Sequence, residues 1–324
     1  MSYEPQSLQD AVVYFGNPDN CVAYLLARRW PDGKAVCPGC GSASVSYNAT
    51  RRTWKCASHH AKREFSIKVG TIMEDSAIPL DKWLMTMWLV TNCKNGVSSY
   101  EIARDVKVTQ KSAWFMLHRI RLAMQDENFG SKLRGEVEAD ETFIGGKARN
   151  MHKDVKARRI HSKHGNSARD KAVVMGMLER GGKVRYQVIA DRHQTTLHPI
   201  VQKHVEPGSI VYTDELGGYK GLDKNYIHQI IDHANKYVDG RIHTNGMENF
   251  WSLLKRGLNG TYIAVEPFHL FRYLDEQVFR YSNRSTKDKK VTDSDRFNKV
   301  VRQIVGKRLT FAELTGKVGA AEAF

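Results

Sequence analysis

The chain has 324 residues, 41% of them hydrophobic, which allows about two domains with real cores and argues against disorder throughout. Its 50 Lys and Arg residues outnumber 35 Asp and Glu residues, and the formal net charge of +15 favours an anionic partner such as nucleic acid or an anionic surface. The longest apolar run covers only residues 83–90 and the N-terminus has no leader pattern, so we expect a cytoplasmic protein with neither a membrane span nor a secretion signal.

A metal-binding pattern lies near the N-terminus. Cys37 and Cys40 form a Cys-x-x-Cys knuckle, and Cys56 follows together with two histidines, His59 and His60. A tetrahedral zinc ion takes two ligands from one tight turn and two from a separate hairpin, so this spacing predicts a zinc ribbon with a structural Zn²⁺. The spacing favours His59 as the fourth ligand and leaves His60 as the alternative. A short hairpin with incidental buried cysteines is the competing interpretation.

A pair of helices is predicted farther along the chain. Ser98 and Glu101 form a capping box that opens a helix over 99–106, and Thr109 can cap a second helix across a short turn. Two helices in this arrangement indicate a helix-turn-helix, although a plain helical hairpin would produce the same pattern. Basic residues on the second helix lie away from its apolar face and are expected to point toward phosphates: Lys111, His118, Arg119 and Arg121.

A β-rich half begins near residue 135. Hydrophobic and acidic residues alternate in EVEADETFIGG, as in a strand, and a Gly-Gly pair joins two further β-rich runs. After this first strand the predicted elements are strands at 171–179 and 184–190, a helix at 197–204, strands at 209–214 and 226–231, and a helix at 245–255. This order predicts an α/β fold, a mixed five-stranded sheet with helices of RNase H-like order.

Three acidic residues lie on separate predicted elements of this half. Asp140 is on the first strand, Asp214 ends the fourth strand, and Glu248 is in the last helix. We expect them to converge at one sheet edge, where carboxylates can hold two divalent metals for phosphodiester chemistry. Mg²⁺ suits such a sparse acidic site. Lys255 follows Glu248 by seven residues, so it projects from the same helix face and would hold a phosphate beside the metals.

Several segments together resemble the DDE transposases of bacterial insertion sequences that carry an N-terminal zinc ribbon. They are the CPGC knuckle, EFSIKVGTIMEDSAIPLDKW, VEADETFIGG, VYTDELGGY and HTNGMENFWSLLKRGLNGTY, and the resemblance covers most of residues 20–284. It implies an RNase H-like catalytic core that uses magnesium or manganese on the terminal inverted repeats of its own mobile element.

The resemblance also assigns site residues. Asp140 and Asp214 match the first two catalytic carboxylates, and Lys255 matches the basic residue after the third. Asn245 and Glu248 both fit the third position, one helical turn apart. We prefer Glu248, because an ionised carboxylate binds a hard cation more strongly than an amide oxygen does, and Asn245 is then a supporting residue or a DNA contact.

Other charged residues receive simpler interpretations. Three acids near the expected ligands are interpreted as structural: Glu138, Glu141 and Glu215. The strongly basic stretch over 147–171, which includes Arg158 and Arg159, is expected to guide DNA toward the metals, with a solvated disordered loop as the alternative. Arg256, next to Lys255, is expected to contact DNA as well.

The sequence thus predicts a DNA transposase that binds double-stranded element ends and target DNA, then cleaves and joins them. Its expected parts are a helical segment (1–33), a zinc ribbon (34–72), a helix-turn-helix domain (78–127), an RNase H-like core (133–284) and a basic tail (285–324). Because two ends must meet, we expect a homodimer or larger assembly on DNA, at the bacterial nucleoid. A DNA-binding regulator with a silent core and an RNase H-like nuclease are the alternatives.

Overall fold

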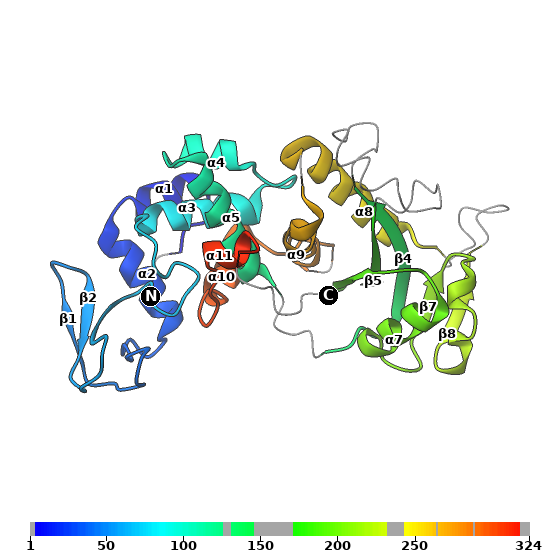
Figure 1. Ribbon diagram of the computed structural model, residues 1–324, viewed down its shortest axis with the longest axis horizontal. Coiled ribbons are helices and arrows are strands. Elements are labelled where there is room, and N and C mark those ends of the chain that lie inside the picture. Colours follow the sequence, from blue (N-terminus) through cyan, green and yellow to red (C-terminus); the bar gives the residue numbers. More distant parts are fainter. Residues whose placement is uncertain are drawn as a thin grey trace. The chain divides into compact units, whose positions relative to one another are not determined.

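Residues 1–125 and 283–323 form one compact unit of the computed structural model, and residues 126–282 form a second (Figure 1). None of the helices described is long and apolar enough to cross a membrane. The described residues are 4–125, 131–145, 171–231, 243–263, 265–287 and 289–317.

Two helices and a small sheet open the first unit. The helices are α1 (Leu8–Phe15) and α2 (Pro18–Arg29), and the antiparallel sheet has the order β1 (Val45–Asn48), β2 (Thr53–Cys56), β3 (Glu64–Ser66). Trp54 on β2 stacks on Phe65 of β3 with ring centroids 6.0 Å apart, which gives the sheet an apolar face. The Ala57 amide donates to the Ser44 carbonyl at 2.9 Å, so the end of β2 is tied to the chain that follows the Cys-x-x-Cys turn.

The predicted helix pair is present as α4 (Ser99–Asp105) and α5 (Gln110–Met124), after α3 (Leu80–Asn92). Both predicted caps are confirmed, because Ser98 Oγ accepts from the Glu101 amide and Thr109 Oγ1 accepts from the Ser112 amide, each at 3.2 Å. Each cap satisfies a backbone donor that the first helical turn leaves without a partner. Local sequence therefore determined where these two helices begin.

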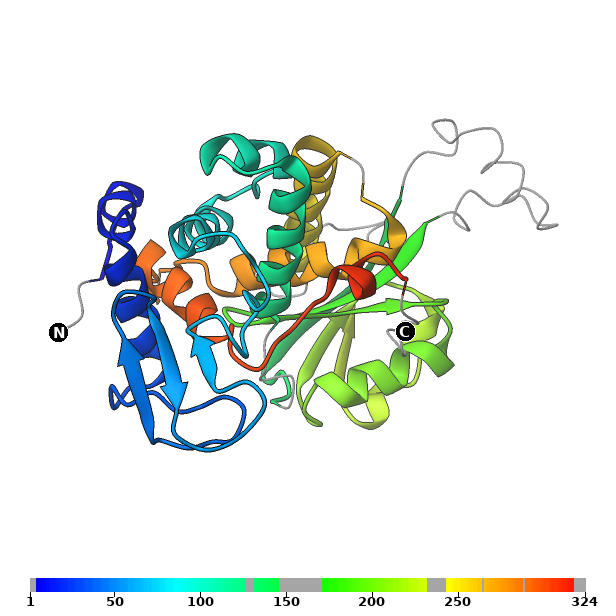
Figure 2. The ribbon, with the colours of Figure 1, turned by 60° about the vertical axis from the view of Figure 1, so that its left-hand side comes forward.

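The segment expected as a basic tail belongs to the first unit. It forms α10 (Asp293–Arg302) and α11 (Phe311–Leu314), and α10 contacts α3 (Figure 2). Phe297 of α10 is fully buried, with ring centroids 5.7 Å from Tyr24 and 5.1 Å from Trp88. Burying these aromatic surfaces is more favourable than leaving α10 solvated, so the chain returns from the second unit to complete the core of the first.

The second unit is built on a mixed five-stranded sheet, as predicted. The strands are β4 (Glu136–Ile144), β5 (Ala172–Glu179), β6 (Val184–Ile189), β7 (Ile210–Thr213) and β8 (Ile227–Ile230), in the order β6-β5-β4-β7-β8. β4, β5 and β6 pair antiparallel, whereas β7 pairs parallel with β4 and with β8. The Gly-Gly hairpin between β5 and β6 is where the sequence indicates it.

Two helical layers cover the sheet. Helix α7 (Gln194–His204) packs on one face with Val137 and Ala139 of β4, and α8 (Asn245–Gly257) with α9 (Leu270–Ser282) packs on the other (Figure 2). Since side chains alternate along a strand, Glu138 and Asp140 lie on the α8 face of β4. The alternation of apolar and acidic residues in β4 thus directs its acids toward α8.

Candidate catalytic and metal sites

Strand pairing aligns the first two predicted carboxylates. In the parallel β4–β7 pair, Glu136 lies opposite Ile210 and Glu138 lies opposite Tyr212. Continuing this register by two residues places Asp140 level with Asp214, which directly follows β7. Asp214 is close enough for its negative charge to raise the pKa of Asp140, although 74 positions separate the two acids in the sequence.

Helix α8 orients Asp140. Trp251 Nε1 of α8 donates to Asp140 Oδ2 at 3.1 Å, and the Glu141 amide donates to Asp140 Oδ1 at 2.8 Å. The strand residue opposite Asp140 is Gly176, and a Cβ at that position would lie 2.3 Å from Met247 Cε and 2.6 Å from the Trp251 ring. The missing side chain of Gly176 therefore lets α8 approach the sheet closely enough for Trp251 to reach Asp140.

Glu138 anchors the beginning of the same helix. Its side chain is 2% exposed, and it accepts from Arg180 Nε at 2.9 Å and from the Met247 amide at 2.9 Å. Thr244, the N-cap residue, makes no side-chain cap, so the carboxylate of Glu138 takes that role from the neighbouring strand. These contacts make Glu138 a structural acid.

Glu248 lies in the first turn of α8, within electrostatic reach of Asp140. Its side chain is exposed, as is that of Asn245 one turn earlier. The pKa of Asp140 is raised to about 6, chiefly by burial and also by the negative charges of Asp214 and Glu248, which together outweigh the hydrogen bonds from the Glu141 amide and Trp251. The three acids therefore share one electrostatic environment with an excess of negative charge, and carboxylate oxygens are the donors that Mg²⁺ and Mn²⁺ prefer.

Glu141 is a fourth acid that the sequence interpretation set aside. It lies on the α7 face of β4 and accepts a hydrogen bond from the buried Tyr219 hydroxyl. The pKa of Glu141 is raised to about 7, chiefly by burial and also by the charges of Asp214 and Asp140, against the hydrogen bond from Tyr219. The alternation of β4 correctly predicts that Glu141 points away from Asp140, but it does not reveal that the loop after β7 carries Asp214 within electrostatic reach of both.

The basic residues at the end of α8 are exposed. Lys255 and Arg256 occupy its last turn, and Lys255 lies on the face that also carries Glu248 and Asn245. Arg158 and Arg159, predicted to contact DNA, lie outside the described residues.

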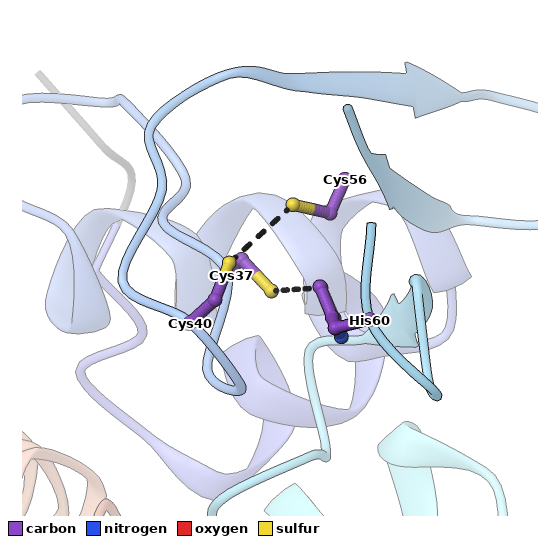
Figure 3. Close-up of side chains that lie close together, drawn as sticks. All are labelled: Cys37, Cys40, Cys56 and His60. Atoms are coloured by element: carbon purple, nitrogen blue, oxygen red, sulfur yellow. Dashed lines mark hydrogen bonds between the residues drawn. The ribbon is translucent and has the colours of Figure 1, made fainter. Parts of the chain in front are cut away.

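The zinc-ligand pattern is present with one correction. Cys37, Cys40, Cys56 and His60 place their ligand atoms within 4.8 Å of one another, with Cys37 Sγ 3.4 Å from His60 Nε2 and Cys40 Sγ 3.6 Å from Cys56 Sγ (Figure 3). His59, favoured by spacing, is exposed instead, because the loop after β2 turns the next residue inward. Three thiols and an imidazole in this arrangement fit a tetrahedral structural Zn²⁺.

Within the described parts of the chain, the carboxylates of Asp140, Asp214 and Glu248 are not gathered as tightly as these four zinc-ligand side chains.

The basic face predicted for α5 is largely buried. Arg119 is 5% exposed and donates to the carbonyl oxygens of Leu309, Ile72 and Glu74 at 2.8–2.9 Å, and Arg121 is 1% exposed. Arg119 is thus bonded to backbone of its own unit rather than displayed on the surface as expected, and His118 is buried as well. Lys111, at the start of α5, is exposed as predicted.

Comparison with known proteins agrees with the motifs. Residues 132–282 match the family described as ISXO2-like transposase domain, and residues 16–60 match the transposase zinc-ribbon domain. The chain is 27% identical over 246 residues, 73% of its own length and 82% of the relative's, to an uncharacterized protein in transposable element ISH50 of Halobacterium salinarum. It is 34% identical over 106 residues, 32% of its own length and 85% of the relative's, to an uncharacterized transposase-like protein of Haemophilus influenzae. The chain belongs to the transposase family defined by the ISXO2-like transposase domain and carries the zinc ribbon of such transposases.

Proposed function

We propose that this protein is an active DNA transposase, which binds the terminal inverted repeats of its insertion sequence and catalyses metal-dependent DNA cleavage and strand transfer. The observation that supports this best is the register that aligns Asp140 with Asp214, beside the helix that carries Glu248. Three antiparallel strands followed by two parallel ones, with helices on both faces, are also consistent with an RNase H-like core.

Each residue has a definite part in this proposal. Asp140, Asp214 and Glu248 hold the catalytic metals, with Asn245 near the third ligand. When bound, Mg²⁺ or Mn²⁺ would supply activation of the attacking oxygen and stabilisation of the leaving oxygen of the phosphodiester. Trp251 keeps the Asp140 carboxylate oriented through its hydrogen bond. Lys255 holds a phosphate next to the acids, because its ammonium group is exposed on the same face of α8.

DNA binding would draw on several surfaces. The formal net charge of +15 favours attraction to the DNA backbone. Exposed Lys111 and Arg256 are the described residues that we assign to phosphate contacts, together with Arg158 and Arg159 of the basic stretch. The helix pair α4–α5 would act as a helix-turn-helix, and the zinc ribbon would stabilise the element-end binding part. A homodimer or larger assembly at the nucleoid would bring two ends together.

The test is a Mg²⁺-dependent cleavage and joining assay on duplex DNA that carries the terminal repeats, read from the DNA flanking the gene. Asp214→Asn is compared with Glu215→Gln, a matched control in which the next acid along the chain, an exposed one, loses its charge. We expect Asp214→Asn to lower both cleavage and joining by at least about 100-fold, as expected for a lost metal ligand, and to leave DNA affinity unchanged.

Three results would contradict the proposal. Equal effects of the two substitutions would remove Asp214 from the site. Tight, end-specific binding by the wild type without any cleavage would indicate a DNA-binding regulator with a silent core. Cleavage without joining would indicate a nuclease.

A further inference from the structure

A pocket of about 400 Å³ opens in the second unit where β4 ends. Its wall combines the end of β4 with the end of α8, the π-helix Leu258–Tyr262 and the chain that leads into α9. Ile144 and Ile263 contribute apolar surface, and Lys255 and Asn259 contribute polar groups. This volume is in the range of pockets that hold one small organic group.

The pocket lies directly beyond the carboxylates along two elements. Helix α8 runs alongside β4 in the same direction. The Met247 amide donates a hydrogen bond to Glu138 at 2.9 Å, and Trp251, one turn later, donates to Asp140, two residues farther along β4, at 3.1 Å. Both elements then continue into the pocket wall. Seven residues at 1.5 Å each put Lys255 about 10 Å along the helix from Glu248, a distance of about three stacked nucleotides, or fewer in an unstacked strand.

The chemistry of the wall fits one part of a DNA strand. Phosphates and sugars are polar and solvated, so an apolar pocket beside a phosphate-binding lysine suits a base. The aliphatic side chains of Ile144 and Leu258 offer apolar surface to the faces of a base, and the Asn259 amide offers donors and an acceptor for a base edge. A base inside a duplex cannot reach such a pocket without leaving its stack.

Ile263 is held in an exposed position at the edge of the pocket. Ile263 is 80% exposed and has a φ of 60°, a left-handed conformation that is costly for a β-branched residue. Tyr262, just before it, is anchored by a hydrogen bond to Glu276 and by its ring, 4.8 Å from the Tyr273 ring. The fold thus holds an apolar side chain outward at the edge of the pocket, as proteins do where they press a side chain against bases.

We propose that this pocket receives a single base, extruded from the DNA end, while Lys255 holds a neighbouring phosphate. The inference rests on the proposed DNA transposase function and adds to it a subsite for an unpaired nucleotide close to the cleaved bond. It also predicts that unpairing near the cleavage position assists the reaction, because the extruded base no longer has to leave a pair.

The test uses the full-length protein and terminal-repeat duplexes in which 2-aminopurine replaces one base at a time near the cleavage position. In Ca²⁺, without cleavage, we expect a fluorescence rise on binding at one position only. Asn259→Ala should lower both that rise and the Mg²⁺-dependent cleavage rate by about tenfold, the size expected for one lost hydrogen bond. Asn249→Ala is the matched control, an exposed asparagine on α8 that does not line the pocket.

A mismatch opposite the responding position provides the second measurement. It should restore cleavage by Asn259→Ala more than it raises cleavage by the wild type, an effect that a merely unfolded variant would not show. A complex that cleaves its DNA without a fluorescence rise at any position would contradict the proposal that the pocket receives a base. The transposase proposal would still hold. A rise without cleavage would support the pocket and contradict the catalytic proposal.

Discussion

Replacing Gly176 with alanine tests whether the close approach of α8 positions the acidic site. The added Cβ would lie 2.3 Å from Met247 Cε and 2.6 and 2.8 Å from two ring atoms of Trp251. The end of a methionine side chain can rotate away, whereas the indole ring is 4% exposed and hydrogen-bonded to Asp140. We therefore expect α8 to shift from the sheet and the Trp251–Asp140 hydrogen bond to lengthen or break.

The magnitude follows from two contributions. Overpacking a close-packed site costs about 1–3 kcal/mol, and losing a hydrogen bond to a charged group costs about 1.5–3 kcal/mol. Because the shift that relieves the clash also weakens the bond, the two are not fully additive, and we expect about 2–4 kcal/mol. For a unit of this size each kcal/mol lowers Tm by about 2–4 °C, so the expected decrease is about 5–15 °C.

Calorimetry of the purified protein measures this decrease in Tm. Urea unfolding followed by Trp251 fluorescence shows whether the loss of stability is in the second unit. Trp251 is the one tryptophan of residues 126–282, so substituting it with phenylalanine identifies its share of the signal. Gly217→Ala is the control, since a Cβ there meets nothing within 4 Å. A Gly176→Ala protein with unchanged Tm and unchanged DNA cleavage would refute the reasoning.

Three other predictions address the remaining polar groups. The pKa values of Asp140 and Glu141 are raised to about 6 and about 7, chiefly by burial. The folded metal-free protein therefore binds protons more tightly than the unfolded chain does. Its free energy of unfolding should fall by about 1–3 kcal/mol as pH rises from 4 to 7. Urea titrations across that range measure it, and an equal slope in Asp140→Asn would speak against it. Glu138→Ala should cost about 1–3 kcal/mol, because it removes the acceptor of the buried Met247 amide at the α8 N-terminus and one of the ion-pair partners of Arg180. A loss under about 0.5 kcal/mol in urea unfolding would exclude that role. His60→Ala should abolish stoichiometric zinc in atomic absorption while His59→Ala retains it, and the reverse result would restore the spacing-based assignment.

Local sequence predicted much of the fold because local interactions decide it. The caps at Ser98 and Thr109 use side chains within three residues of the amides they bind, so they are visible in the sequence. The alternation in β4 likewise predicts a strand and its two faces, and the Gly-Gly pair predicts the β5–β6 hairpin. The Cys-x-x-Cys knuckle predicts the zinc ribbon, although spacing alone does not distinguish His59 from His60.

Long-range packing is the reason that the basic face of α5 is less exposed than the sequence suggested. Helical periodicity correctly separates an apolar face from a basic one, but it does not show whether the basic face is covered. Arg119 is covered by chain from two distant segments, one around residue 72 and one at Leu309. The sequence alone does not distinguish an arginine that is buried and donates to backbone carbonyl oxygens from an exposed arginine that binds phosphate.

The sequence by itself determined which chemical groups the protein carries: three cysteines with histidines that fit zinc, and carboxylates on separate elements, to which we assign divalent metals as a proposal. The tertiary structure alone decided how they meet. The parallel register of β4 and β7, continued two residues beyond its last pair, brings Asp140 level with Asp214, and the absence of a side chain at Gly176 lets α8 and Trp251 lie close to the sheet. Both depend on contacts between residues far apart in the chain, which no local pattern specifies.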